Sequence, residues 1–142
     1  MTEHDIYKMI ADYLRYQYPT VIYRFDLAAD LKLTMGQASK HKRLQRYRGY
    51  PDLFIAAPVV SRERGACYTD RFWCGLFLEI KKDGTRIFKK DGKLVADEHI
   101  REQYDMLRDL RTKGYAAEFG IGFEATKKLI DDYMKGRYAH VD

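Results

Sequence analysis

Two short segments place charged side chains in runs that are otherwise typical of buried strands. In "GYPDLFI", residues 49–55, Asp52 precedes an apolar run, and in "LFLEIKK", residues 76–82, Glu79 and Lys81 lie inside another. Burying a carboxylate or an ammonium without a partner costs free energy, so such charges indicate a metal, an ion pair or a reaction. A structural salt bridge among the three groups is the alternative to a catalytic set.

The strand pattern predicts which of these groups meet. Successive side chains of a strand point to opposite faces, so Glu79 and Lys81 share one face. Asp52, at the start of a neighbouring strand, would add a second carboxylate, and the Ile80 carbonyl would add a neutral oxygen ligand. Such an oxygen-only site suits Mg²⁺ or Mn²⁺. The metal would activate a water for attack on a phosphodiester, while Lys81 orients or deprotonates that water and stabilises the developing charge.

Basic residues gather on both sides of these segments. The net charge is +5 and the pI is near 9.1, a balance that suits a polyanionic partner such as nucleic acid. Residues 40–48 contain no acid, and a second excess of bases spans residues 81–93. A run of basic residues usually forms a solvent-exposed face without a binding role. Two such runs that flank one motif favour phosphate contacts instead. The residues predicted to bind nucleic acid are Lys40, Lys42, Arg43, Arg46, Arg48 and Lys82.

The elements that must position these residues follow from periodicity and from turn signals. Helical spacing predicts three helices, and β-branched or aromatic runs predict four strands. The order is helix 3–19, strands 20–28, 51–57 and 74–82, helix 97–114, strand 115–122 and helix 123–137. Residues 34–47 form either a short basic helix or an ordered loop, and the connection 58–73 would cross a substrate groove or cover a sheet edge. The Asp-Gly pairs at 83–84 and 91–92 predict a hairpin.

This order predicts an α/β fold in which a mixed central sheet is flanked by helices, as one domain over residues 1–142. Glu3 lies on the apolar stripe of the first helix, with Thr2 as the N-cap, and Gln103 lies on the inner face of the second. Both also have a purely structural explanation. A carboxylate such as Glu3 is favoured at a helix N-terminus by the helix dipole, and Gln103 at the edge of the core could hydrogen-bond to the backbone. His99, one turn before Gln103, could face the site, although a lone His at a helix start is more often structural.

Composition narrows the class of protein. Apolar residues make up 46% of the chain and charged residues 33%, and no apolar stretch approaches the roughly 18 residues that span a membrane. The N-terminus lacks the pattern of a secretory leader, so we expect a cytoplasmic protein, in a bacterium or in a host cell, without a membrane partner. Cys67 and Cys74 are then expected to be free thiols, because their spacing is a weak zinc signal.

The ordered combination of motifs resembles the PD-(D/E)XK nuclease superfamily, with its restriction-endonuclease-like core. An acid in the first helix, then "GYPD", "LEIK" and a helix carrying "EQ", resembles more closely the virus-type replication and repair nuclease domain, VRR-NUC, along nearly the whole chain. The long connection between Asp52 and Glu79 departs from that pattern. The resemblance implies that the site consists of Glu3, Asp52, Glu79, Lys81 and Gln103.

The resemblance also implies an activity. It predicts a Mg²⁺- or Mn²⁺-dependent endonuclease that hydrolyses DNA phosphodiester bonds in replication, recombination or repair. A viral source is one of the origins that the resemblance allows. Family members of this size suggest a homodimer acting on branched DNA such as a Holliday junction, since two sites related by a dyad cut two strands symmetrically. Two alternatives stay open: a non-catalytic nucleic-acid-binding protein, and a nuclease that acts on RNA.

Overall fold

Four strands form a mixed sheet at the centre of the molecule. The computed structural model describes residues 1–26, 32–63 and 69–141. The sheet has the order β1-β2-β5-β6, and its strands are β1 (Tyr23–Phe25), β2 (Leu53–Ile55), β5 (Leu76–Lys81) and β6 (Ala116–Ile121). β1, β2 and β5 are antiparallel, whereas β6 runs parallel to β5. The predicted mixed sheet is confirmed.

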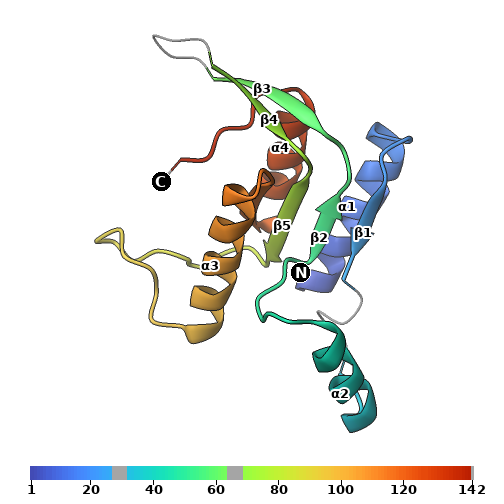
Figure 1. The fold of residues 1–142 in the computed structure, drawn as a ribbon, viewed down its shortest axis with the longest axis vertical. Helices are drawn as coiled ribbons and strands as arrows, with labels where there is room; N and C mark the ends of the chain where they lie inside the picture. Colours follow the sequence, from blue (N-terminus) through green and yellow to red (C-terminus); the bar gives the residue numbers. More distant parts are fainter. Residues whose placement is uncertain (27–31, 64–68, 142) are drawn as a thin grey trace.

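Helices cover both faces of this sheet (Figure 1), because β5 carries apolar side chains on each. α1 (Glu3–Gln17) and α4 (Gly122–Met134) pack on one face, where Ile10 of α1 meets Leu78 and Ile80 in the main core. α3 (Glu98–Thr112) packs on the other face, where Leu107 meets Phe77. The predicted α/β layering is therefore confirmed.

Side-chain caps fix where the helices near the site begin. The Thr2 hydroxyl accepts from the Asp5 backbone N–H at 3.1 Å, and the Asp5 carboxylate accepts from the Thr2 N–H at 2.8 Å. The Asp97 carboxylate accepts from the His99 N–H at 2.9 Å at the start of α3. These caps satisfy backbone donors that a helix leaves unpaired. They fix the first turns, which carry Glu3 and His99.

Three segments differ from the sequence-based predictions or decide between them. Residues 34–47 contain a helix, α2 (Met35–Leu44), which has no buried residue and lies apart from the other helices (Figure 1). The connection 58–73 forms a two-stranded antiparallel sheet of its own, β3 (Val59–Glu63) and β4 (Thr69–Trp73). The predicted hairpin is confirmed only at the second Asp-Gly pair, where Phe88 bridges Leu94 in antiparallel fashion and the Val95 N–H donates to the Ile87 carbonyl oxygen at 3.0 Å; the first pair forms a turn without paired strands in the described residues.

No helix in the described part of the chain is long and apolar enough to cross a membrane. Cys74 is an exposed free thiol, as predicted, and Cys67 lies outside the described residues.

Candidate functional site

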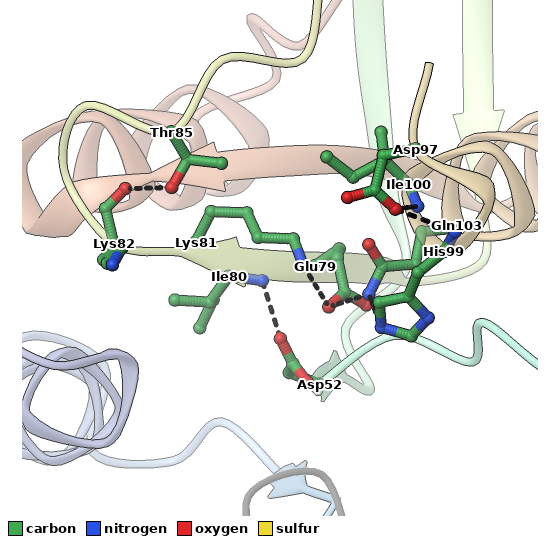
Figure 2. A network of polar contacts seen from close by, with 10 residues as sticks. All are labelled: Asp52, Glu79, Ile80, Lys81, Lys82, Thr85, Asp97, His99, Ile100 and Gln103. Carbon is green, nitrogen blue, oxygen red and sulfur yellow. Dashed lines mark hydrogen bonds and ion pairs between the residues drawn. The ribbon is translucent and has the colours of Figure 1, made fainter. Parts of the chain in front are cut away.

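The pairing of β2 with β5 brings two carboxylates together at the end of the sheet. Leu53 is opposite Leu78, so the preceding residue, Asp52, comes next to Glu79. Asp52 is 4% exposed and Glu79 is 3% exposed. The Ile80 backbone N–H donates to Asp52 Oδ2 at 2.8 Å, which fixes the Asp52 side chain against β5 (Figure 2). Two acidic groups are therefore held side by side in a nearly water-free position.

Burial and mutual repulsion change the protonation of this pair. Burial raises the pKa of Glu79 to about 10, and the neighbouring Asp52 adds to the rise. Burial also raises the pKa of Asp52, although hydrogen bonds from Glu79 and the Ile80 N–H act in the opposite direction. A raised pKa means that the ionised pair is unfavourable by itself. The pair therefore favours a positive charge, either a shared proton or a cation.

Lys81 and Gln103 both approach the same oxygen of Glu79 (Figure 2). The Lys81 Nζ lies 3.8 Å from Glu79 Oε1, and the Gln103 Nε2 donates to that oxygen at 2.8 Å. Lys81 comes from the same strand as Glu79, two residues on, whereas Gln103 reaches across from α3. The Glu79 carboxylate is thus oriented from two sides.

Two buried oxygen atoms at the site have no hydrogen-bond partner among the described residues, and they test whether a metal fits. They are Glu79 Oε2 and Gln103 Oε1. A buried acceptor without a donor costs free energy, and a cation would remove that cost. The described residues contain no group of three or more His, Cys, Asp or Glu placed to hold a metal. Mg²⁺ needs only one or two carboxylates, so Asp52, Glu79 and a backbone carbonyl fit its requirement.

Tyr7 is a site residue that the sequence reasoning missed. It lies on the inner face of α1, 9% exposed, and its hydroxyl hydrogen-bonds to Asp52. Burial raises the pKa of the Tyr7 hydroxyl, and the Asp52 charge adds to the rise. The signal was its position one turn after Glu3 on the same helical face.

Glu3 lies at the edge of the site. It is partly exposed in the first turn of α1, and its charge contributes to the raised pKa values of Tyr7 and Glu79. His99 lies closer: its Nε2 is 3.2 Å from the Gln103 Nε2. Since the Gln103 amide nitrogen is a donor, His99 accepts through this nitrogen. His99 therefore contacts the site through Gln103, the alternative that the sequence left open beside a structural role.

The predicted phosphate-binding residues are all exposed, as phosphate contacts require. Three belong to α2, and the others lie in the segment 45–48 and directly after β5. Gly49 connects this basic segment to the site: its φ is 78°, and a Cβ there would lie 2.8 Å from the Glu102 carbonyl oxygen of α3. Only glycine allows so close an approach in this conformation. The segment therefore packs against α3 next to Gln103.

Comparison with known proteins shows the fold of the chain. A solved structure described as a VRR_NUC domain protein superposes with a TM-score of 0.60, covering 95% of this chain and 89% of the other, at 23% sequence identity. No protein-family model and no curated protein matches the chain. The chain therefore has the fold of a VRR_NUC domain protein, which confirms the fold predicted from the sequence motifs.

Proposed function

We propose that this chain is a divalent-metal-dependent nuclease of the VRR-NUC type that hydrolyses DNA phosphodiester bonds. The observation that carries the proposal is the buried pair Asp52 and Glu79, which meets Lys81 and Gln103 at one end of the sheet. The buried oxygen Glu79 Oε2, which has no hydrogen-bond partner in the described structure, supports a cation as the missing partner. A salt bridge with Lys81 compensates Glu79 Oε1, so Oε2 requires either the proton shared with Asp52 or a cation, and chelation distinguishes the two.

Each residue has a distinct role in this proposal. Asp52, Glu79 and the Ile80 carbonyl hold Mg²⁺ or Mn²⁺, which supplies a Lewis acid for phosphodiester hydrolysis. Lys81 places a positive charge beside Glu79, where it orients the attacking water and stabilises charge on the phosphate. Gln103 positions the Glu79 carboxylate.

Residues outside this set support it. Tyr7 positions Asp52 through its hydroxyl, and Glu3 adds negative charge at the rim. Lys82, exposed directly after β5, and the bases of residues 40–48 bind the phosphates that flank the cleaved bond.

The proposed substrate is branched DNA, such as a four-way junction, handled by a homodimer in the cytoplasm during replication, recombination or repair. A positive surface on the projecting α2 supports a DNA partner, because phosphate contacts supply most of the affinity of such complexes. Two sites in a dimer would cut two strands of one junction. Light scattering at the working concentration tests the dimer, and a monomer that is fully active on junctions would contradict it.

A cleavage panel tests the proposal directly. Linear duplex, flap, splayed-arm and four-way junction DNA, with matched RNA, are incubated with Mg²⁺, with Mn²⁺ or with chelator. We expect metal-dependent DNA cleavage that is lost in Asp52→Asn and Glu79→Gln, which conserve side-chain shape. Glu124→Gln is the matched control, because Glu124 is an exposed acid on α4. Equal cleavage by the wild type and Glu79→Gln would refute the proposal.

A further inference from the structure

A cavity of about 1110 Å³ opens beside α3, separate from the candidate metal site. Its walls come from β4, residues 85–92, α3, β6 and the C-terminal segment, and Asp52, Glu79, Lys81 and Gln103 are not among its lining residues. Small-molecule sites have volumes of roughly 300–1,000 Å³. The cavity is therefore large enough for a ligand of nucleotide size.

Three arginines line this cavity. Arg71 lies on β4, and Arg108 and Arg111 lie one turn apart on α3. Arg108 pairs with Asp105 at 3.4 Å, but both side chains are largely exposed, and such a pair contributes little. Arg111 uses one N–H donor on the Ala117 carbonyl oxygen, at 2.7 Å. The guanidinium groups therefore keep donors for an anion, and their planar geometry matches phosphate.

The acidic group of the cavity is already engaged within the protein. Glu118 Oε1 accepts from the Tyr138 hydroxyl at 2.7 Å and contacts His140 Nδ1 at 2.6 Å. Three arginines therefore outweigh one hydrogen-bonded carboxylate, and the cavity favours an anionic ligand.

Aromatic rings share the cavity with the arginines. Phe88 is 49% exposed, and its ring meets Tyr104 edge-on with 6.1 Å between centroids. Trp73 forms part of the wall, and the Arg71 guanidinium lies 4.2 Å from its ring centroid. An exposed ring beside positive charge is the combination that binds a nucleobase and its phosphate together. A simple phosphate or an acidic peptide would use the arginines but leave the ring of Phe88 without a flat partner.

We infer that this cavity binds a nucleoside phosphate, with the phosphate held by the arginines and the base stacked on Phe88. The ligand is either a free nucleotide or one unit of a single-stranded nucleic acid. This inference goes beyond the proposed nuclease function, because binding in the cavity requires neither the metal nor Glu79. A protein that cleaves nothing would still bind here.

The single tryptophan of the chain, Trp73, provides the measurement. Glu79→Gln protein in chelator is titrated separately with dAMP, deoxyadenosine, short oligo-dA and a Glu-rich peptide, while tryptophan fluorescence is recorded. We expect saturable quenching by dAMP or by oligo-dA, and none by the peptide. If both dAMP and oligo-dA quench, a free nucleotide is sufficient as the ligand. If oligo-dA alone quenches, the ligand is a nucleic-acid strand.

Two variants separate the phosphate from the base. Arg108→Gln should weaken binding of the phosphorylated ligand about tenfold, which corresponds to about 1.4 kcal/mol, and leave any binding of deoxyadenosine unchanged. Phe88→Ala should weaken binding of both. Lys128→Gln is the matched control, since it removes one exposed charge from α4, outside the cavity, and should leave binding unchanged.

Circular dichroism verifies that each variant is folded. The inference is overturned if neither dAMP nor oligo-dA quenches, if the Glu-rich peptide quenches equally, or if both cavity variants bind like Lys128→Gln.

Discussion

Gln103 of α3 donates to Glu79 of β5 at 2.8 Å, and this hydrogen bond joins the helix to the strand that carries the candidate site. Because the same amide nitrogen contacts His99 at 3.2 Å, the orientation of the amide is fixed, and its buried oxygen has no donor in the described structure. The structure thus presents a positioned carboxylate beside an uncompensated carbonyl oxygen.

Metal-free Glu79→Gln protein should be more stable than metal-free wild type, by an amount that grows with pH. Burial and Asp52 raise the pKa of Glu79 from 4.5 to about 10. The folded state therefore keeps a proton that the unfolded state releases, so this contribution to stability is complete below pH 4.5 and is lost as pH rises towards 10. Urea unfolding in chelator at about pH 5, 7 and 9 measures the difference. A difference that stays constant with pH would contradict the prediction.

Lys81→Ala should spare metal binding and reduce turnover by about 10² or more, the scale seen when a charge-stabilising donor is lost from a preorganised site. Calorimetric titration with Mn²⁺ and single-turnover cleavage separate the two effects. Lys128→Ala is the matched control, because Lys128 is an exposed lysine of α4 outside the candidate site. Turnover unchanged in Lys81→Ala would remove this residue from the mechanism.

Tyr7→Phe should reduce turnover about tenfold by releasing the Asp52 side chain, since a hydrogen bond to a charged group contributes about 1.5–3 kcal/mol. Tyr13→Phe is its control: it also removes a hydroxyl that bonds to a carboxylate, Asp131, which belongs to α4 and not to the candidate site. Urea unfolding of both variants measures the stability that each hydroxyl contributes; in Tyr13→Phe, Asp131 still accepts from the Tyr18 hydroxyl at 2.6 Å. An equal loss of turnover in both would show that Tyr7 acts only through stability.

Gly49→Ala should lower both stability and activity, because the new Cβ would collide with the Glu102 carbonyl oxygen and force the segment away from Gln103. Gly84→Ala is a control with nearly the same backbone strain, since its φ is 81° and nothing lies within 4 Å of the added Cβ. The shared strain costs about 1–2 kcal/mol. Thermal unfolding and cleavage rates of both variants are compared. A Gly49→Ala enzyme as active as Gly84→Ala would argue against this role of the segment.

Replacing Lys42, Arg43 and Arg46 by Ala should weaken binding to all DNA duplexes alike. Each lost phosphate contact changes the log-log salt slope by about 0.9, so we expect a slope flatter by about two to three. Cleavage of bound substrate should persist, and so should folding, because α2 has no buried residue. If the slope is unchanged, these bases form a solvated face, and the DNA track lies between Lys81 and Lys93.

The sequence predicted those parts of the fold that depend on the local spacing of apolar residues along a helix or a strand. Alternation in "LEIK" placed Glu79 on the face opposite Leu78, and the structure has that arrangement. The contact of Tyr7 with Asp52 depends on how α1 packs on the sheet, which no local pattern specifies. Thr34 and Gln37 form a capping box that identifies α2 as a helix, a signal that the prediction did not use. The two Asp-Gly turns differ in their flanks: apolar residues lie on both sides of Asp91-Gly92, where Phe88 bridges Leu94, whereas Asp83-Gly84 is followed by Thr85 and Arg86 and closes no strand pair in the described residues.

The isolation of α2 has a consequence for the thermodynamics of binding. A ten-residue helix without a buried residue is shorter than the roughly 12–15 residues that make an isolated helix even marginally stable in water. Its helix content in the free protein should therefore fall on mild warming, long before the sheet melts. Any ligand that holds its bases would have to restore the lost turns, and part of the interaction enthalpy would be offset by the entropy of ordering them. The affinity for such a ligand should accordingly fall more steeply with temperature than it would if α2 were a preformed, rigid helix.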